Sequence, residues 1–364
     1  PEFKGEWEKC IIKDYGEVVT GNTPPTSKAE YYNNASYLWA SPADLGINKN
    51  ITDTKAKLSL LGFKKTRAIP KGSVLVTCIG STIGKMGMAV ETMSSNQQIN
   101  SIVVNDKSNN DFVYYAIYRA FPRYLPEVGV QAVPILSKSN FEKLPNYTTS
   151  RKEQNKIGYF LNLLDERIAT QNKIIEDLKK LKSAIAESLF KTIKGDIIAL
   201  SEICDIVKGK QINGEFLSES GRYYVMNGGT EPSGFYDNYN VEANTISISE
   251  GGNSCGYVQF NTAPFWSGGH CYTIQEITNN VENMYLYHYL KSKEDTIMQL
   301  RIGSGLPNIQ KKDLAKFKVI VPAIERQKTI SVFLSLLERK AEIETEILIA
   351  MQSEKQYLLR QMFI

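Results

Sequence analysis

The sequence contains one long helical segment twice, and this duplication limits the folds that the chain can adopt. The stretch RKEQNKIGYFLNLLDERI from Arg151 and the stretch ERQKTISVFLSLLERKAEI from Glu325 align without a gap at an offset of 173. A second match, at an offset of 188, joins IKDYGEVVTG from Ile12 to LSEICDIVKG from Leu200. The chain is therefore a tandem repeat in which a variable segment precedes each long helix.

Both helical segments carry a heptad pattern that is interrupted by a polar residue at the same place. Apolar residues recur at alternating steps of three and four, and the two stripes are Ile157, Leu161, Leu164, Ile168, Ile175 and Leu178, and Ile330, Leu334, Leu337, Ala341, Leu348 and Met351. Gln171 interrupts the first stripe and Glu344 the second, again at an offset of 173. We expect these two residues to fix the register of the helices at some cost in stability.

The length of each stripe predicts that the two helices pack on each other. A helix of about 40 residues extends roughly 60 Å, and a single apolar stripe of that length needs a partner. The other copy in the same chain is the economical partner, and the globular segment between the copies favours an antiparallel coiled coil. The alternative is that each helix packs only on its own domain, but the matching polar layer argues against it.

The two variable segments have the pattern of strand-rich domains. Short alternating apolar runs broken by Gly, Pro, Asn and Ser, such as GSVLVTCIG from Gly72 and NTISISEGG from Asn244, indicate strands. Each segment has one helical stretch near its end, from Asn110 and from Asn283. The predicted fold class is α+β with an internal pseudo-two-fold repeat. Two strand-rich α/β domains, residues 1–150 and 195–322, are separated by long helices at residues 151–194 and 323–364.

Polar loops recur at matching places in the two variable segments. TGNTPPTS (20–27) corresponds to KGKQING (208–214), IGSTIGK (79–85) to EGGNSCG (250–256), and SSNQQIN (94–100) to WSGGHC (266–271). Divergent loops on a repeated framework indicate two different binding specificities. Their Asn, Gln, Ser, Thr and Lys residues are the types that contact base edges and phosphates, although any one of them alone is equally typical of a solvated turn.

Several classes of protein are disfavoured by what the sequence lacks. GSTIGKM resembles a P-loop only superficially, because three residues rather than four separate Gly80 from Gly84 and Met86 replaces the residue that would meet magnesium. We find no HExxH helix and no Asn-Pro-Pro-aromatic sequence of the kind that amino-methyltransferases use. The five cysteines form no CxxC pair, and His270 and His288 lie in no zinc-binding pattern. We therefore expect no metal site. No apolar run approaches the roughly 20 residues that span a bilayer, and the unpaired cysteines suit a reducing compartment, so we expect a cytoplasmic protein.

The motifs resemble those of the specificity subunit of type I restriction-modification systems. The resemblance covers essentially the whole chain and rests on GEVVTGNTPPTS, on IGSTIGK followed by NQQIN, and above all on the duplicated helical segments. It implies two target-recognition domains that read the halves of a bipartite, asymmetric site in double-stranded DNA, with the helix pair as the ruler between half-sites. The KGKQING and GGNSCG loops of the second variable segment match the family pattern less well.

The resemblance also implies partners and cofactors. Two methyltransferase subunits, which carry S-adenosylmethionine and methylate adenine N6, would bind the helices and the target-recognition domains. Two restriction subunits would supply translocation and cleavage with ATP and magnesium, so this chain itself would be a non-catalytic, cofactor-free part of a phage defence system. The candidate contacts to the methyltransferase are Glu166, Arg167, Glu338 and Arg339, for which a solvated helix flank is the alternative reading.

Eleven residues in the polar loops are the candidates for DNA contact. They are Thr23, Ser27, Lys85, Asn96, Gln97 and Gln98 in the first domain and Lys208, Lys210, Asn213, Asn253 and His270 in the second. Asn and Gln side chains suit adenine, and Lys suits guanine or phosphate. Pro24 and Pro25 would stiffen the first loop without touching bases.

The charge of the second variable segment is a test of this interpretation. Residues 1–150 hold 17 basic and 13 acidic side chains, a net charge of +4, whereas residues 195–308 hold 6 and 13, a net charge of −7. Acidity opposes attraction to phosphate. Three explanations are open: the basic residues of this segment cluster on one face, the methyltransferase subunits supply most phosphate contacts, or the domain does not read DNA. We favour the first two together. They predict that the isolated chain binds DNA weakly. The alternatives from other classes are a coiled-coil scaffold protein without DNA reading, a self-sufficient methyltransferase or nuclease, and a specificity subunit of another DNA-modification defence system.

Overall fold

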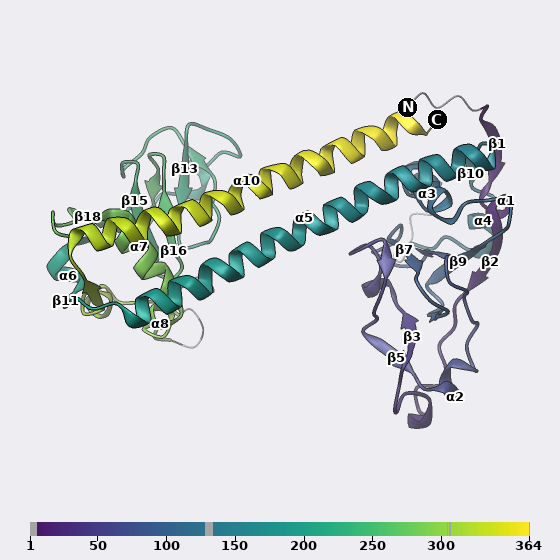
Figure 1. The fold of residues 1–364 in the computed structure, drawn as a ribbon, viewed down its shortest axis with the longest axis horizontal. Coiled ribbons are helices and arrows are strands. Elements are labelled where there is room, and N and C mark those ends of the chain that lie inside the picture. Colours follow the sequence, from purple (N-terminus) through teal and green to yellow (C-terminus); the bar gives the residue numbers. More distant parts are fainter. Residues whose placement is uncertain (1–5, 128–133, 304, 306, 364) are drawn as a thin grey trace. The chain divides into compact units, whose positions relative to one another are not determined.

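A computed structural model describes residues 6–127, 134–303, 305 and 307–363 of the chain (Figure 1). The chain divides into two compact units, Pro1–Asn172 with Glu346–Ile364 (unit 1) and Lys173–Thr345 (unit 2). Each unit holds one variable segment together with parts of both long helices, which are α5 (Arg151–Thr192) and α10 (Ile324–Met362).

Unit 1 is built on a five-stranded sheet. Its strands, in order across the sheet, are β2 (Gly16–Thr20), β9 (Ile99–Val104), β6 (Val74–Thr77), β7 (Met86–Ala89) and β4 (Asn50–Ile51). A smaller sheet has the order β5 (Ala56–Leu58), β3 (Tyr37–Ala40) and β8 (Ser94–Ser95), and β1 (Glu8–Ile11) pairs with β10 (Pro145–Thr148). The short helices are α1 (Ile12–Tyr15), α2 (Leu60–Phe63), α3 (Asn110–Tyr124) and α4 (Lys138–Glu142). The central strand β6 reads VLVT and is buried along its whole length, because both faces of the sheet are covered there.

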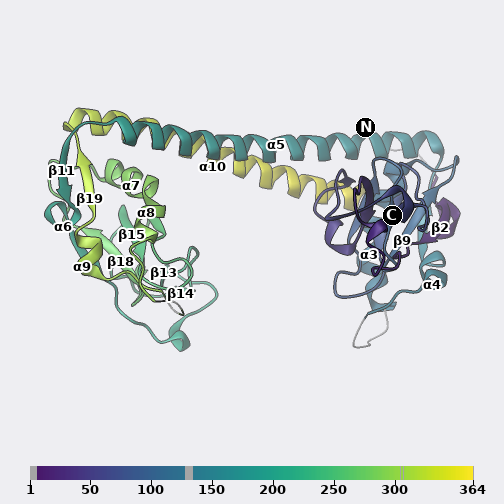
Figure 2. The same ribbon diagram turned by 90° about the horizontal axis from the view of Figure 1, so that it is seen from below.

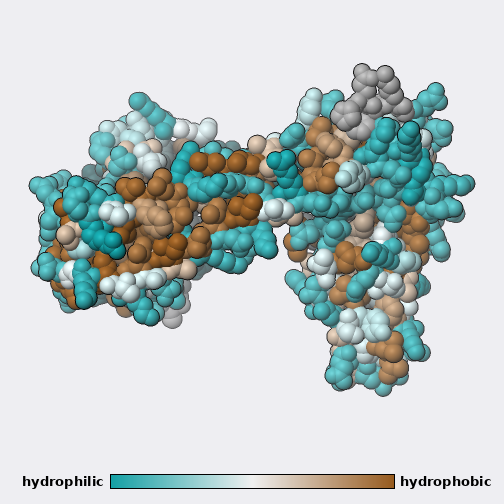
Figure 3. Space-filling model, in the orientation of Figure 1, coloured by the Kyte–Doolittle hydropathy of each residue, from teal (hydrophilic) through white to brown (hydrophobic). Residues whose placement is uncertain are grey.

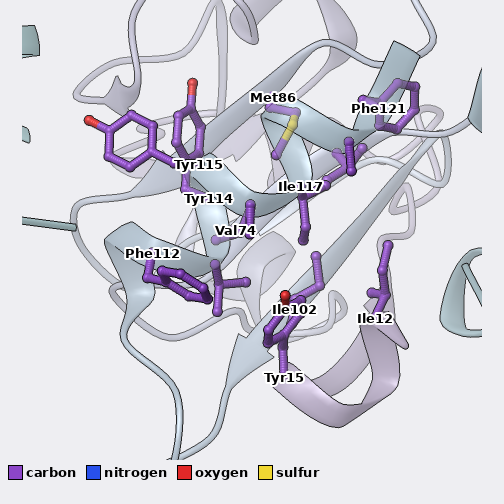
Figure 4. Packing of buried hydrophobic residues seen from close by; sticks show 14 of the residues in the cluster. Ile12, Tyr15, Val74, Met86, Ile102, Phe112, Tyr114, Tyr115, Ile117 and Phe121 are labelled. Atoms are coloured by element: carbon purple, nitrogen blue, oxygen red, sulfur yellow. The ribbon is translucent and has the colours of Figure 1, made fainter. Parts of the chain in front are cut away.

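Helix α3 joins the sheet of unit 1 to the long helices. The Asn109 side chain accepts a hydrogen bond from Phe112 N at 2.9 Å, which satisfies a free amide in the first turn and starts the helix. Phe112 and Ile117 of α3 pack beside Val74 and Ile102 of the sheet (Figure 4). The same buried cluster includes the start of α5 and the end of α10, so the domain and the long helices share one core.

Unit 2 repeats the architecture of unit 1. Its main sheet has the order β12 (Asp205–Lys208), β18 (Cys271–Gln275), β15 (Thr245–Ser249) and β16 (Val258–Asn261). The smaller sheet has the order β14 (Phe235–Tyr236), β13 (Tyr223–Met226) and β17 (Trp266–Ser267), and β11 (Asp196–Ala199) pairs with β19 (Lys318–Val321). The short helices are α6 (Leu200–Ile203), α7 (Asn283–Ser292), α8 (Glu294–Met298) and α9 (Lys311–Ala315). Within unit 2, α7 lies between the long helices and the strands (Figure 2).

Two buried glutamines show the repeat at the level of single hydrogen bonds. Gln154 Oε1 accepts from Asn109 N and Gln154 Nε2 donates to Thr149 O, both at 2.8 Å. Gln327 makes the same two contacts at 2.8 Å: its Oε1 accepts from Glu282 N, directly before α7, and its Nε2 donates to Pro322 O. All these partners are related by the offset of 173, so the predicted repeat is confirmed. Each glutamine ties the start of a long helix to the start of a domain helix.

The long helices run antiparallel in unit 1. The buried cluster contains Leu161 near the start of α5 and Leu359 near the end of α10. Farther along α5, Asp165 forms an ion pair with Lys355, which lies earlier in α10. Later residues of α5 therefore contact earlier residues of α10, as in an antiparallel pair.

The same arrangement is found in unit 2. Phe190 near the end of α5 and Ile330 near the start of α10 belong to one buried cluster. Earlier in α5, Lys182 forms an ion pair with Glu338, which lies later in α10, at 2.8 Å. This ion pair is the equivalent of the one in unit 1, because each acid and each lysine is displaced by 173 residues.

The polar residues in the heptad stripes are buried. Gln171 is 7% exposed and Glu344 is 9% exposed, and Glu344 forms an ion pair with Lys340 in the preceding turn. The beginnings of both stripes, by contrast, lie in the cores of the two domains. Each helix thus packs on its own domain at one end and on the other long helix beyond it, which combines the two alternatives that the sequence left open.

One predicted loop alignment is wrong by one residue. Gly84 N donates to the carbonyl oxygen seven residues earlier at 2.9 Å, and Gly256 N makes the same contact at 2.8 Å. Both glycines have positive φ, +91° and +94°, so they occupy the same place in the same turn. Residues 79–85 therefore correspond to 251–257 and not to 250–256. The sequence held the signal, because only the corrected alignment matches both glycines of the first loop, Gly80 with Gly252 and Gly84 with Gly256.

Candidate nucleic-acid interface

Three loops of unit 1 meet at one edge of its main sheet. Strands β2 and β6 both pair with β9 in the antiparallel sense, so both end where β9 begins. The loops that follow β2, follow β6 and precede β9 lie within the polar stretches 20–27, 79–85 and 94–100, of which residues 94–95 form β8 and residues 99–100 begin β9. These are the polar loops that the sequence singled out, and the topology brings them together.

Four of the predicted DNA-contacting residues of unit 1 lie in this cluster. Thr23 and Gln97 are exposed, and Thr23 Oγ1 donates to Gln97 Oε1 at 2.6 Å. Gln98 Nε2 donates to Ile79 O of the middle loop at 3.4 Å. Asn96 is only 8% exposed, and its Oδ1 accepts from Gln98 N at 3.0 Å. Asn96 therefore shapes the loop, while the other three present hydroxyl and amide groups of the kind that bind base edges.

The other two predicted residues of unit 1 lie away from this contact. Ser27 is exposed farther along the first loop, within a turn in which Lys28 N donates to Pro25 O at 3.2 Å. Lys85 is exposed, and its side chain packs on Gly46, where an added Cβ would lie 3.1 Å from Lys85 Cγ. Lys85 thereby lines a different feature, a hollow of about 1540 Å³.

The hollow lies in unit 1 among the segment before β4, α3 and the two long helices. Three side chains in its wall, Ile47, Tyr118 and Tyr357, are 74%, 40% and 61% exposed. Glu166 of α5 also lines it. Exposed aromatic and apolar side chains among charges are typical of protein contact surfaces.

A basic turn beside the first loop was missed in the sequence. Asn22 Nδ2 donates to Lys65 O at 2.9 Å, and Arg67 N donates to Asn22 Oδ1 at 2.9 Å. The Arg67 guanidinium donates to Thr20 O at 2.6 Å. These contacts bind the run Lys64, Lys65 and Arg67 to the loop cluster, with all three side chains exposed. The basic run was visible in the sequence, but its position beside residues 20–27 required the fold.

In unit 2 the equivalent loops enclose a charged cluster. Lys208 Nζ lies 2.6 Å from Glu250 Oε1, and His270 Nδ1 lies 3.6 Å from Glu250 Oε2. Tyr272 OH donates to Glu250 Oε1 at 3.3 Å. Burial, followed by the charge of Glu250, raises the pKa of Tyr272 to about 12, so the phenol remains a donor at neutral pH. The structure thus joins the predicted Lys208 and His270 through Glu250, a residue that sequence reasoning did not select.

The remaining predicted residues of unit 2 are exposed along the same loops. Lys210 N donates to Ser267 O at 2.9 Å, which fixes the loop after β12 against β17. Asn213 Oδ1 accepts from Glu215 N at 3.3 Å and so caps a short turn farther along the first loop. Asn253 is exposed at the tip of the middle loop. Lys208, Lys210 and Asn253 therefore border one sheet edge, as their equivalents in unit 1 do.

The four helix residues predicted to contact a partner differ in their surroundings. Glu166 and Arg167 are exposed, and Glu166 Oε1 accepts from Asn162 Nδ2 at 2.7 Å. Arg339 is exposed and pairs with Glu342 at 3.1 Å. Glu338 is partly buried, and it binds Lys182 at 2.8 Å and Tyr287 OH at 3.0 Å. Its carboxylate thus stabilises the helix pair itself.

The cysteines near the loops are buried thiols. Burial is the main cause that raises the pKa of Cys78 to about 12 and that of Cys271 to about 11, so both are neutral at pH 7. In the part of the chain that the structure describes, no group of three or more His, Cys, Asp and Glu side chains is arranged to hold a metal ion. Among the described helices, none has the length and apolar character needed to cross a membrane.

The comparison with known families agrees with this geometry. The family model described as "Type I restriction modification DNA specificity domain" matches residues 4–180 and 195–352, once for each repeat. The chain belongs to this type I specificity family.

Similar proteins carry the same family description. The type I restriction enzyme HindI specificity subunit of Haemophilus influenzae is 28% identical over 214 residues, which cover 57% of this chain and 41% of that protein. A putative type I specificity subunit of Mycoplasma pneumoniae is 32% identical over 151 residues, covering 41% of this chain and 40% of that protein. The chain therefore spans about two fifths of the length of these relatives.

A solved structure of a type I specificity subunit shares the fold over nearly the whole length. The crystal structure of a type I restriction-modification S subunit from M. genitalium covers 99% of this chain and 97% of that chain, with a TM-score of 0.70 and 21% identity. The predicted α+β architecture with two long helices is thereby confirmed.

Proposed function

We propose that this chain is the DNA-specificity subunit of a type I restriction-modification complex and that each unit reads one half of a bipartite, asymmetric site. One observation carries the proposal: the same three-loop cluster occurs at the same sheet edge in both units but presents different side chains. Unit 1 offers hydroxyl and amide groups, whereas unit 2 offers a lysine, a histidine and a carboxylate. Two unlike surfaces on one framework suit a site with two unlike halves.

The charge distribution supports a division of labour in DNA binding. The turn with Lys64, Lys65 and Arg67 places basic side chains beside the base-reading loops of unit 1, where they bind phosphates and hold the domain in register. The net charge of −7 in residues 195–308 leaves unit 2 dependent on phosphate contacts from another protein. The isolated chain therefore binds DNA weakly, and the complex with its partner binds much more tightly.

Two methyltransferase subunits are the partners that supply these contacts. The α10 residues Val332, Phe333, Leu336 and Ile343 of unit 2 are 59%, 45%, 63% and 38% exposed. Hydrophobic side chains gather over this part of the helix pair (Figure 3). A contiguous apolar surface on a long helix supports the packing of partner helices against it, as does the hollow in unit 1.

Catalysis and cofactors belong to the partners. S-adenosylmethionine is bound by the methyltransferase subunits, which methylate adenine N6, while two restriction subunits use ATP and magnesium for translocation and cleavage. The specificity subunit performs no catalysis and acts with them in the cytoplasm in defence against phage. Its own residues select the site and hold the partners on it.

The test is a genome-wide map of N6-methyladenine in cells that express this chain with its methyltransferase partner, compared with the partner alone. A single new bipartite motif that depends on this chain supports the proposal and defines both half-sites and the spacer. Unchanged methylation in cells where the complex assembles would contradict DNA reading and favour the scaffold alternative.

A further inference from the structure

Four equivalent positions form the floor of the loop cluster in each unit. They are Thr20, Cys78, Gln98 and Asn100 in unit 1, and Lys208, Glu250, His270 and Tyr272 in unit 2. The strand registers pair Thr20 with Asn100 in unit 1 and Lys208 with Tyr272 in unit 2. Cys78 N donates to Gln98 O at 2.8 Å in unit 1, and Glu250 N donates to His270 O at 2.9 Å in unit 2.

The floor is neutral in unit 1 and charged in unit 2. In unit 1, Thr20 Oγ1 donates to Asn100 Oδ1 at 2.7 Å, and the Cys78 thiol is buried. In unit 2, the Glu250 side chain is 11% exposed and lies between Lys208 and His270, whose side chains are 51% and 61% exposed. The buried Glu250 carboxylate thus faces two exposed side chains, Lys208 and His270.

One oxygen of this carboxylate is not used within the described part of unit 2. Glu250 Oε1 accepts hydrogen bonds from Lys208 at 2.6 Å and from Tyr272 at 3.3 Å. Glu250 Oε2 is buried and has no hydrogen-bond partner in the structure, although His270 Nδ1 faces it at 3.6 Å. A buried carboxylate oxygen without a donor is costly, and its presence needs a reason other than the stability of the domain.

We propose that Glu250 is a positioning residue that holds Lys208 and His270 for reading a G·C base pair in the half-site of unit 2. This inference rests on the proposed function of the chain. The ammonium group of Lys208 has three donors, and Glu250 occupies one of them. Guanine presents two acceptors, N7 and O6, on its major-groove edge, so it matches the donors that remain.

The pairing with Glu250 favours a base edge over a phosphate as the ligand of Lys208. The carboxylate compensates the ammonium charge and itself repels phosphate, so the pair has little net attraction for the DNA backbone. Hydrogen bonds to guanine do not require net charge, and the salt bridge restricts the lysine to one direction. His270 is held from a second side, because its backbone N–H donates to Asn227 Oδ1 at 3.1 Å.

The test maps methylation motifs of the full complex with three variants of the chain. Lys208→Met removes the donors, and Glu250→Gln keeps the shape but removes the charge that orients them. Glu294→Gln is the matched control, because Glu294 forms an ion pair with Lys291 of the same length, 2.6 Å, elsewhere in unit 2. We expect K208M and E250Q to lower the preference for G·C at one position of one half-site by about 5- to 100-fold. The other half-site stays unchanged, and E294Q retains the full motif.

The outcomes separate this inference from the proposed function. The absence of any motif with the unaltered chain would overturn the proposed function itself. A bipartite motif whose two halves are both unaltered by K208M and E250Q would overturn the inference alone. A uniform loss of methylation without a change in base preference would also overturn it, because a structural or phosphate-binding role would give that result. Relaxation by E250Q without relaxation by K208M would exclude the positioning role.

Discussion

Replacement of Gln154 by leucine should destabilise unit 1 and leave unit 2 intact. The substitution keeps the size of a side chain that is 3% exposed but removes its hydrogen bonds to Asn109 N and Thr149 O. Each of the two backbone groups then loses its partner at a cost of about 1–3 kcal/mol, so the total is about 2–6 kcal/mol. The equivalent substitution Gln327→Leu should have the same effect on unit 2, since it removes the same two bonds.

Amide hydrogen exchange followed by mass spectrometry measures the two units separately in the whole chain. At about 1.4 kcal/mol per tenfold change, the loss corresponds to exchange at least about 30-fold faster in the affected unit. Q154L should accelerate exchange in α3 and Q327L in α7. Gln352→Leu, at an exposed position of α10, is the control and should leave both helices unchanged. Acceleration of less than about fivefold by both variants, or equal acceleration of both helices by either one, would refute the reasoning.

Three further predictions concern other parts of the structure. Burial lowers the pKa of His288 from 6.5 to about 4, and because the unfolded state then binds the proton more readily, stability should fall as the pH drops from about 6.5 to about 4. The difference in unfolding free energy between the unaltered chain and His288→Gln, measured by urea denaturation, should change by about 3 kcal/mol over that interval, and a constant difference would contradict the prediction. Lys65→Ala should lower the slope of log K against log salt for DNA binding by the complex by about one, whereas Lys107→Ala at the opposite end of β9 should not; equal slopes would exclude a phosphate contact. Lys182→Met leaves the partly buried Glu338 without its ion-pair partner and should destabilise unit 2 by about 1–3 kcal/mol in thermal unfolding, while Lys180→Met, which breaks an exposed pair, should leave the melting temperature unchanged.

The duplicated helices could be predicted from the sequence because their signal is periodic and local. The offset that aligns Gln154 with Gln327 also relates Asp165 to Glu338 and Lys182 to Lys355, so the two ion pairs between the helices are equivalent under the repeat. The sequence did not reveal which charges pair, because that depends on where the antiparallel helices meet. Glu338 was therefore interpreted as a surface residue although it binds Lys182 and Tyr287.

The loop cluster was predicted only in part. Sequence patterns located Thr23 and Gln97, since Gly- and Pro-containing polar stretches mark loops, and also Lys208, which ends β12 directly before such a stretch. The basic turn around Lys65 was missed because its contact with residue 22 is made across the fold. Glu250 was missed because an acid is an unexpected choice for DNA binding, and its role is visible only between Lys208 and His270.

The most direct test of the account is the methylation motif of the complex that contains the double variant Thr23→Ala, Gln97→Ala. These two exposed side chains are hydrogen-bonded to each other at the loop cluster of unit 1 and have no part in unit 2. We predict that one half-site loses base preference, at a cost of about 1–3 kcal/mol per lost base contact, while the other half-site and the spacer are unchanged. A motif that is unaltered in both halves, or that loses preference in both halves together, would contradict the claim that each unit reads its own half of the site.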